Sequence, residues 1–332
     1  MSNSESGGNP FCGIGDRWAR LVAFLATASR LPTTPDAFTA RYGAFPGAGE
    51  VDAFVTSIAA LNELAIEAGG AAALNSELST DPAALQGDAS PASLFSRVLW
   101  LANRTFNVAE NAANTLSELP QLLAPSAGGV ADRARALNLV LAGPGGLTEA
   151  FGQIRMQSAQ AETALTAFAT RVAAVSRQLA ESKLLNQANV AIGEANSANQ
   201  RLARQKPNPP PRDEDTDPMP DPAEKMAVNQ VEVSRKEAFV GDSAALFSRN
   251  DKAGTLVPEI AAAMAGLALR FQRAANQLVQ FCAISTEAQL ADAAWVSQAL
   301  ELPAMIAGWR QLGEAAQLFT QRALLASAGA GS

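Results

Sequence analysis

Apolar residues recur every three or four positions along nearly the whole chain, which is the spacing of helices that bury one face. The first such stretch carries Trp18, Leu21 and Leu25 on one side. No stretch alternates apolar and polar residues as a β-strand does, and only residues 231–233 hint at one. The pattern therefore predicts an all-α protein, a mainly antiparallel bundle of about eight helices. The predicted helices begin, in chain order, at Asp16, Val51, Asp81, Ser90, Val130, Leu147, Pro258, Thr286 and Pro303.

The longest predicted helix is the spine of the bundle and covers residues 147–205, which are 59 positions without a proline. Apolar side chains repeat there with a seven-residue period, the spacing by which helices pack along a seam. Such a helix would be about 88 Å long at 1.5 Å per residue. The seam becomes polar in its second half, where a break near Gly193 is an open alternative. The positions predicted to form the helix-packing or assembly seam are Phe151, Ile154, Leu165, Phe168, Val172, Val175 and Leu179.

Residues 206–222 form a proline-rich segment, KPNPPPRDEDTDPMPDP, with seven prolines and five acidic residues. Prolines prevent a helix there and the charges resist burial, so we expect an exposed linker or loop. The segment separates two helical regions, and small polar residues suggest flexible tails at both ends of the chain. The expected organisation is a tail at 1–15, a helical region at 16–205, the linker at 206–222, a second helical region packing on the first at 223–326, and a tail at 327–332.

The acidic residues in and after this linker have the spacing of an EF-hand calcium loop, which supplies hard oxygen ligands at fixed positions. Pro218, however, occupies the sixth loop position, where glycine normally makes the sharp turn. The segment is therefore a weak candidate for a calcium site, and a solvated acidic linker is the favoured interpretation. The matching residues, at loop positions 1, 3, 5, 9 and 12, are Asp213, Asp215, Asp217, Asp221 and Glu224.

Composition removes most catalytic arrangements, because the chain contains no histidine. Histidine triads, histidine metal sites and histidine proton shuttles are thereby excluded. No glycine-rich phosphate loop follows a predicted strand, and no nucleophile is paired with a base. The chain is therefore predicted not to be an enzyme and to bind no cofactor.

Net charge and hydropathy limit the kinds of partner and the cellular compartment that the sequence predicts. The net charge is −7, from 25 basic and 32 acidic residues, which argues against a nucleic-acid partner. The N-terminus has neither the basic nor the apolar region of a classical secretion signal. The longest uncharged stretches, 136–148 and 274–286, have 13 residues each, fewer than the roughly 20 that a membrane-spanning helix needs. We expect a soluble protein, cytoplasmic as synthesised, with export by a non-classical route left open.

Two classes of function remain. The favoured prediction is a non-enzymatic, self-associating structural or scaffold protein, a subunit of a coat, filament or other assembly, whose partner is itself or another helical protein. The long seamed helix and the many small residues favour it. The alternative is the soluble component of a helical pore-forming toxin that inserts into membranes after a conformational change. The apolar stretches 260–269 and 274–286 favour this alternative, and the lack of one long uncharged hairpin weighs against it.

Overall fold

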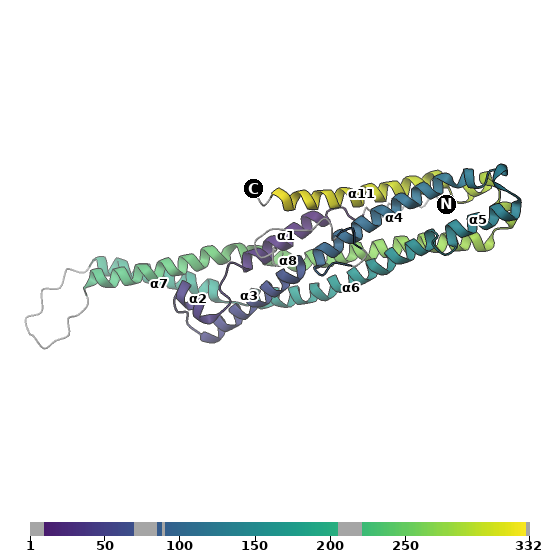
Figure 1. Cartoon of the computed structure of the whole chain (residues 1–332). Coiled ribbons are helices and arrows are strands. Elements are labelled where there is room, and N and C mark those ends of the chain that lie inside the picture. The colour runs from purple at the N-terminus through teal and green to yellow at the C-terminus, as the bar shows by residue number, and fades with distance from the viewer. Residues whose placement is uncertain (1–9, 70–84, 88–89, 205–220, 330–332) are drawn as a thin grey trace, which may run out of the picture. The chain divides into compact units, whose positions relative to one another are not determined.

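The computed structural model of the chain describes residues 10–69, 85–87, 90–204 and 221–329 (Figure 1). Every regular element in those ranges is helical, which confirms the predicted all-α bundle. A short 3-10 helix, η2, covers Pro125–Ala127. The α-helices are α1 (Ile14–Ala28), α2 (Pro35–Tyr42), α3 (Ala48–Gly69), α4 (Leu94–Leu122), α5 (Val130–Ala142), α6 (Leu147–Ala180), α7 (Leu184–Ala203), α8 (Pro222–Ile284), α9 (Glu287–Leu290), α10 (Ala293–Ala299) and α11 (Leu302–Gly329).

The chain divides into two compact units, each assembled from separate stretches of sequence. Unit 1 takes residues 1–22, 66–170 and 255–332, and unit 2 takes residues 23–65 and 171–254. Four helices, α1, α3, α6 and α8, belong partly to each unit. Each unit therefore combines chain from before and after the proline-rich segment, most of which lies outside the described residues.

Residues 10–15, where the described part of the chain begins, contribute to the core. Phe11 is buried and stacks on Phe319 of α11, with 5.7 Å between the ring centroids, and the buried Ile14 begins α1. The predicted flexible tail is therefore wrong for residues 10–15, because two large apolar side chains in this stretch enter the core. Residues 1–9 lie outside the described residues, and at the other end α11 extends the helical chain to Gly329.

The predicted spine is present but consists of two consecutive helices, α6 with 34 residues and α7 with 20. The chain turns at residues 181–183, where the hydroxyl of Ser182 accepts a hydrogen bond from the N–H of Leu184 at 3.4 Å. Lys183 is the N-cap of α7 and its side chain makes no capping hydrogen bond, so the contact from Ser182 is a long one from the residue before the cap. Gly193 lies inside α7, so the helix does not break at the position that the sequence left open.

The longest helix is α8, with 63 residues, although the sequence predicted a helix only from Pro258 onward. Asp221 accepts a hydrogen bond from the N–H of Ala223 at 3.2 Å, and Pro222 takes the first helical position, where its missing N–H is not needed. The strand suggested at residues 231–233 is wrong, because these residues lie inside α8. Pro258 is also inside α8, where it cannot donate to the carbonyl of Gly254.

A seven-residue repeat of buried positions runs along α8. In unit 2 three of these positions hold polar residues, Lys236, Ser243 and Asn250, which are 2%, 0% and 5% exposed. These polar residues interrupt the apolar spacing, which explains why the first half of α8 was not predicted as a helix. At the same spacing the repeat continues in unit 1 with Val257, Met264, Phe271 and Leu278, all of which are buried.

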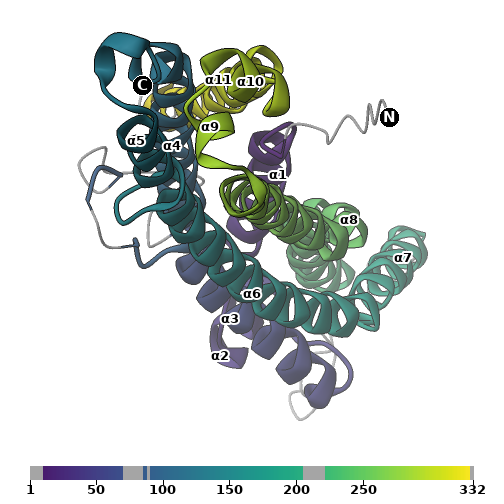
Figure 2. The ribbon, with the colours of Figure 1, turned by 90° about the vertical axis from the view of Figure 1, so that its right-hand side faces the viewer.

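In unit 1 the helices α4 and α11 lie side by side and run in opposite directions (Figures 1 and 2). The predicted start at Ser90 is wrong by three residues, because the N-terminal end of α4 is capped by Ser93, whose hydroxyl accepts from the N–H of Ser96 at 3.3 Å. The start predicted at Asp81 lies outside the described residues. The short helix α9 packs near α5, and Arg133 of α5 donates to the carbonyl of Ala291 at 3.0 Å. The capping box predicted at Thr286 is present at the start of α9.

Aromatic side chains form the centre of each unit. In unit 1, Phe151 of α6 lies 4.6 Å from Trp309 and 5.5 Å from Phe271, measured between ring centroids. In unit 2, Phe239 of α8 is surrounded by four aromatic rings at centroid distances of 5.3 to 5.7 Å. Such edge-to-face pairs add to the free energy gained by burial. The four rings around Phe239 belong to Phe38, Tyr42, Phe45 and Phe54.

We expect Phe239→Ala to lower the free energy of unfolding of unit 2 by about 3–5 kcal/mol, because it leaves a cavity among the four rings. Denaturant unfolding measures this loss. The matched control is Val228→Ala, a truncation at a 69% exposed position of the same helix, which should change stability by less than about 0.5 kcal/mol. Equal effects of the two substitutions would contradict the central role of Phe239.

Candidate functional site

The predicted seam lies in the core of the folded chain. Each of its seven residues is 8% exposed or less, including Phe168 and Val172, which are fully buried. Phe151 at one end contacts the aromatic rings of Phe271 and Trp309. The seam therefore packs helices within one chain, and a surface for assembly has to lie elsewhere.

The calcium candidate is only partly described. Asp213, Asp215 and Asp217 lie outside the described residues. Asp221 and Glu224 are exposed at the start of α8, where Asp221 caps the helix. In the ranges that the structure describes, no three acidic or cysteine side chains gather as a metal site. Calcium binding by the whole acidic run thus stays a prediction.

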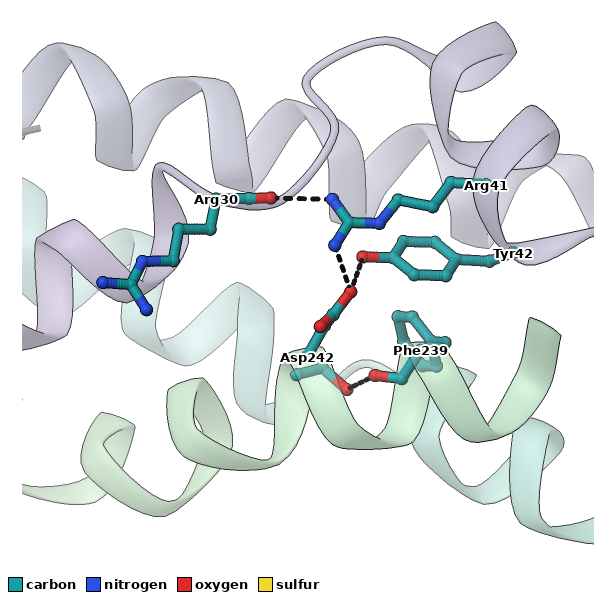
Figure 3. Close-up of polar contacts among 6 residues, drawn as sticks. Arg30, Arg41, Tyr42, Phe239 and Asp242 are labelled. Carbon is teal, nitrogen blue, oxygen red and sulfur yellow. Dashed lines mark hydrogen bonds and ion pairs between the residues drawn. The ribbon is translucent and has the colours of Figure 1, made fainter. Parts of the chain in front are cut away.

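A polar cluster in unit 2 joins α2 to α8 (Figure 3). The carboxylate of Asp242 accepts a hydrogen bond from the hydroxyl of Tyr42 at 2.8 Å and forms an ion pair with Arg41. Arg41 also donates to the backbone carbonyl of Arg30 at 3.0 Å. Close by, Ser243 donates to the carbonyl of Phe239 at 2.6 Å, so its hydroxyl is engaged inside α8 and is not a free nucleophile.

Burial raises the pKa of the Tyr42 phenol well above its ordinary value. The hydrogen bond to Asp242 and the negative charge of that carboxylate act in the same direction, while Arg41 opposes them. The phenol therefore stays protonated and serves as a hydrogen-bond donor to Asp242 at neutral pH. This cluster therefore holds α2 and α8 together within unit 2.

Lys236 makes a second contact between α8 and the end of α2. Its ammonium group donates to the carbonyls of Tyr42 at 2.8 Å and Ala44 at 2.7 Å, and pairs with Glu232 at 2.7 Å. It also lies 4.0 Å from the ring centroid of Phe45. All three ammonium donors therefore have acceptors, which is the condition for burying a charge. Sequence reasoning missed this residue, and the seven-residue spacing to Ser243 and Asn250 was the available signal.

One segment of the described helices, residues 252–284 of α8, is long and apolar enough to cross a membrane by its length and composition. The most apolar 18-residue stretch of this segment has a mean hydropathy of 1.3, and 39% of that stretch is buried in the fold. Glu259, Arg270 and Arg273 interrupt this segment, so no uncharged stretch within it is as long as a membrane-spanning helix. A core helix of a globular protein can have the same composition, so the exposed side chains are the more informative feature.

The exposed side of this segment is apolar over more than two turns. Every exposed residue of α8 between positions 261 and 269 lacks a polar side chain, and Leu269 is 54% exposed. Within unit 1 a groove of about 680 Å³ lies between α6 and α8. Met156, Ala159 and Ala167 line it from α6, and Leu269 lines it from α8. Contiguous apolar surface of this kind marks contact with another protein or with lipid.

Comparison with solved structures finds a similarity to the SmhB pore of the tripartite alpha-pore forming toxin Smh from Serratia marcescens. The two chains are 11% identical, each is covered over 97% of its length, and the TM-score is 0.29. A similarity of that size supports no conclusion about this chain. No protein-family model matches the sequence. The curated proteins include no match to it.

Replacing Phe168 with aspartate should abolish cooperative folding. Loss of a buried phenylalanine side chain alone costs about 3–5 kcal/mol, and the carboxylate adds the cost of burying an unpaired charge. Circular dichroism during thermal unfolding tests this. Thr166→Asp, at an exposed position of the same helix, is the control and should keep the wild-type transition. A Phe168→Asp protein that stays folded and loses only self-association would restore the seam as an assembly surface.

The raised pKa of Tyr42 predicts a loss of stability at alkaline pH. The unfolded phenol ionises near pH 10 while the folded one keeps its proton, so stability falls as the pH rises above 10, by at most about 1.4 kcal/mol per pH unit. Tyr42 is the only tyrosine, so phenolate absorbance reports it alone. We expect native protein to titrate at higher pH than urea-unfolded protein. In Tyr42→Phe this part of the alkaline stability loss should disappear, and a native titration at the unfolded midpoint would refute the prediction.

Proposed function

We propose that this protein is a membrane-active helical protein of the pore-forming type, which folds as described and transfers part of α8 into a lipid bilayer. The observation that supports the proposal is the apolar segment at residues 252–284, whose most apolar stretch the fold leaves mostly unburied. The proposed function is non-enzymatic and requires no cofactor. Its partners would be lipid and further copies of the chain.

The part of α8 best suited to the hydrocarbon core is residues 253–269. These 17 residues form a helix about 26 Å long, close to the roughly 30 Å thickness of the core. Arg270 and Arg273 follow directly, and long arginine side chains at a helix end can extend to the lipid headgroups. The only charged residue within the 17 is Glu259.

The free-energy cost of moving this part of α8 into the bilayer comes mainly from Glu259. In the folded chain its carboxylate is paired with the guanidinium of Arg17 on α1, and both residues belong to unit 1. Insertion has to break this ion pair, and a carboxylate in hydrocarbon is expensive unless it is protonated or paired again. Because the pair is exposed to solvent, breaking it costs little by itself. The cost therefore arises in the bilayer, where the carboxylate no longer has its partner.

A self-associating scaffold remains the second candidate, since a copy of the chain could cover the same apolar face. The two functions differ in what triggers assembly. A scaffold assembles in buffer through the exposed apolar residues, whereas the membrane-active protein assembles only when lipid is present. Sedimentation of the protein with and without liposomes separates them.

Liposome flotation tests the proposal directly. Wild-type protein should float with liposomes and release an enclosed dye. Ala262→Asp should bind about 70- to 400-fold more weakly, because aspartate near the centre of an inserted helix costs about 2.5–3.5 kcal/mol. Ala262 is exposed in the fold, so the substitution should leave the structure intact.

The matched control is Ala245→Asp, the same change at an exposed position of α8 outside the apolar segment. This variant should bind and release dye like wild type. Lipid-independent assemblies that are equal in size for wild type and Ala262→Asp would contradict membrane insertion and favour the scaffold through another surface. A protein that stays monomeric with and without liposomes would exclude both functions.

A further inference from the structure

A cavity of about 740 Å³ lies in unit 1 between α8 and α11. Pocket volumes of about 300–1,000 Å³ accept ligands of lipid or drug size. The wall is more apolar than polar, and its apolar part includes Phe151, Leu278, Met305 and Trp309. The stacked rings of Phe151 and Trp309 form a rigid side, and the flexible methionine can adapt to an alkyl chain.

Two guanidinium groups and the two amides of Gln277 and Gln311 supply the polar part of the lining, and no acidic side chain takes part in it. Arg270 is partly buried, donates one hydrogen bond to the carbonyl of Gly308 at 3.0 Å and lies 6.0 Å from the ring centroid of Trp309. Arg273 follows one helical turn later, on the same side of α8. Among the described residues neither arginine has an ion-pair partner, although the chain as a whole is acidic.

We infer that this cavity binds an amphipathic anion, a molecule with an alkyl or acyl chain that ends in a carboxylate or phosphate. The apolar wall would take the chain, and the two guanidinium groups would take the anionic head. An arginine offers five N–H donors, of which Arg270 uses one for Gly308, so donors remain for a carboxylate or a phosphate. The paired positive charges without a neighbouring acid distinguish this cavity from the α6–α8 groove, whose wall offers one arginine.

The inference goes beyond the proposed function, because the cavity is complete within the folded unit 1 and needs no bilayer. Two sources could supply the ligand chemistry, a free fatty acid or an anionic phospholipid. Both can be presented as monomers in buffer, laurate for the first and a short-chain phosphatidylglycerol for the second. Membrane insertion is tested on liposomes and this site on monomeric ligands, so the failure of one does not imply the failure of the other.

The experiment titrates the full-length protein with laurate, with short-chain phosphatidylglycerol and with dodecanol, an uncharged chain of the same length as laurate. Calorimetry gives the affinity, and a brominated fatty acid should quench the fluorescence of Trp309 but not of a Trp309→Phe variant. We expect saturable binding of at least one anion, at least about tenfold tighter than dodecanol, since charge-assisted hydrogen bonds hold the head. Binding of laurate would indicate a free fatty acid as the ligand, and binding of phosphatidylglycerol would indicate an anionic phospholipid.

Arg273→Gln should weaken anion binding by about tenfold and leave dodecanol binding unchanged. Because Arg270 also contacts Gly308, the substitution there is Arg270→Lys, which keeps the charge but loses the planar donor fork and should weaken binding as well. The control is Arg310→Gln on the exposed side of α11, which should bind like wild type. Binding of neither anion, equal affinity for laurate and dodecanol, or wild-type affinity in Arg273→Gln would each overturn the inference.

Discussion

The structure depends on one column of buried positions along α8, spaced seven residues apart. In unit 2 the column is polar, and Lys236 and Asn250 each have a partner from another part of the chain. In unit 1 the column is apolar and contains Phe271, at the centre of that unit's aromatic core. Polar groups at such positions lower stability but fix register, because only one alignment satisfies their hydrogen bonds.

The polar part of the column determines how unit 2 is assembled. Lys236 can satisfy its donors only if the last carbonyls of α2 reach it, and Asn250 only if the carbonyl of Ser176 does, at 2.8 Å. The ring of Phe239 lies between these two levels of α8 and packs against the aromatic residues of α2 and α3. Hydrogen bonding thus sets the alignment of the helices, and aromatic burial supplies most of the favourable free energy.

Spacing of apolar residues predicted α1, α3, α5 and α6 well, because each of these helices buries a continuous apolar stripe. The same rule failed for the first half of α8, where buried polar residues stand in the stripe, and it overlooked the turn at 181–183, which carries no proline or glycine. The burial of Phe168 and Val172 followed from the seam. The contact between Tyr42 and Asp242 did not, because the two residues are 200 positions apart and no local pattern joins them.

Pro258 has a mechanical consequence for α8. The boundary between the residues of unit 2 and those of unit 1 falls at Gly254 and Thr255 of α8. In a helix the carbonyl of Gly254 accepts a hydrogen bond from the N–H of residue 258, and Pro258 has no N–H. This turn of α8 therefore lacks one backbone hydrogen bond of the ladder, and it contains a glycine, the residue with the least steric restraint. Bending of this long helix therefore costs least at this turn, where the backbone ladder is incomplete and the steric restraint is lowest.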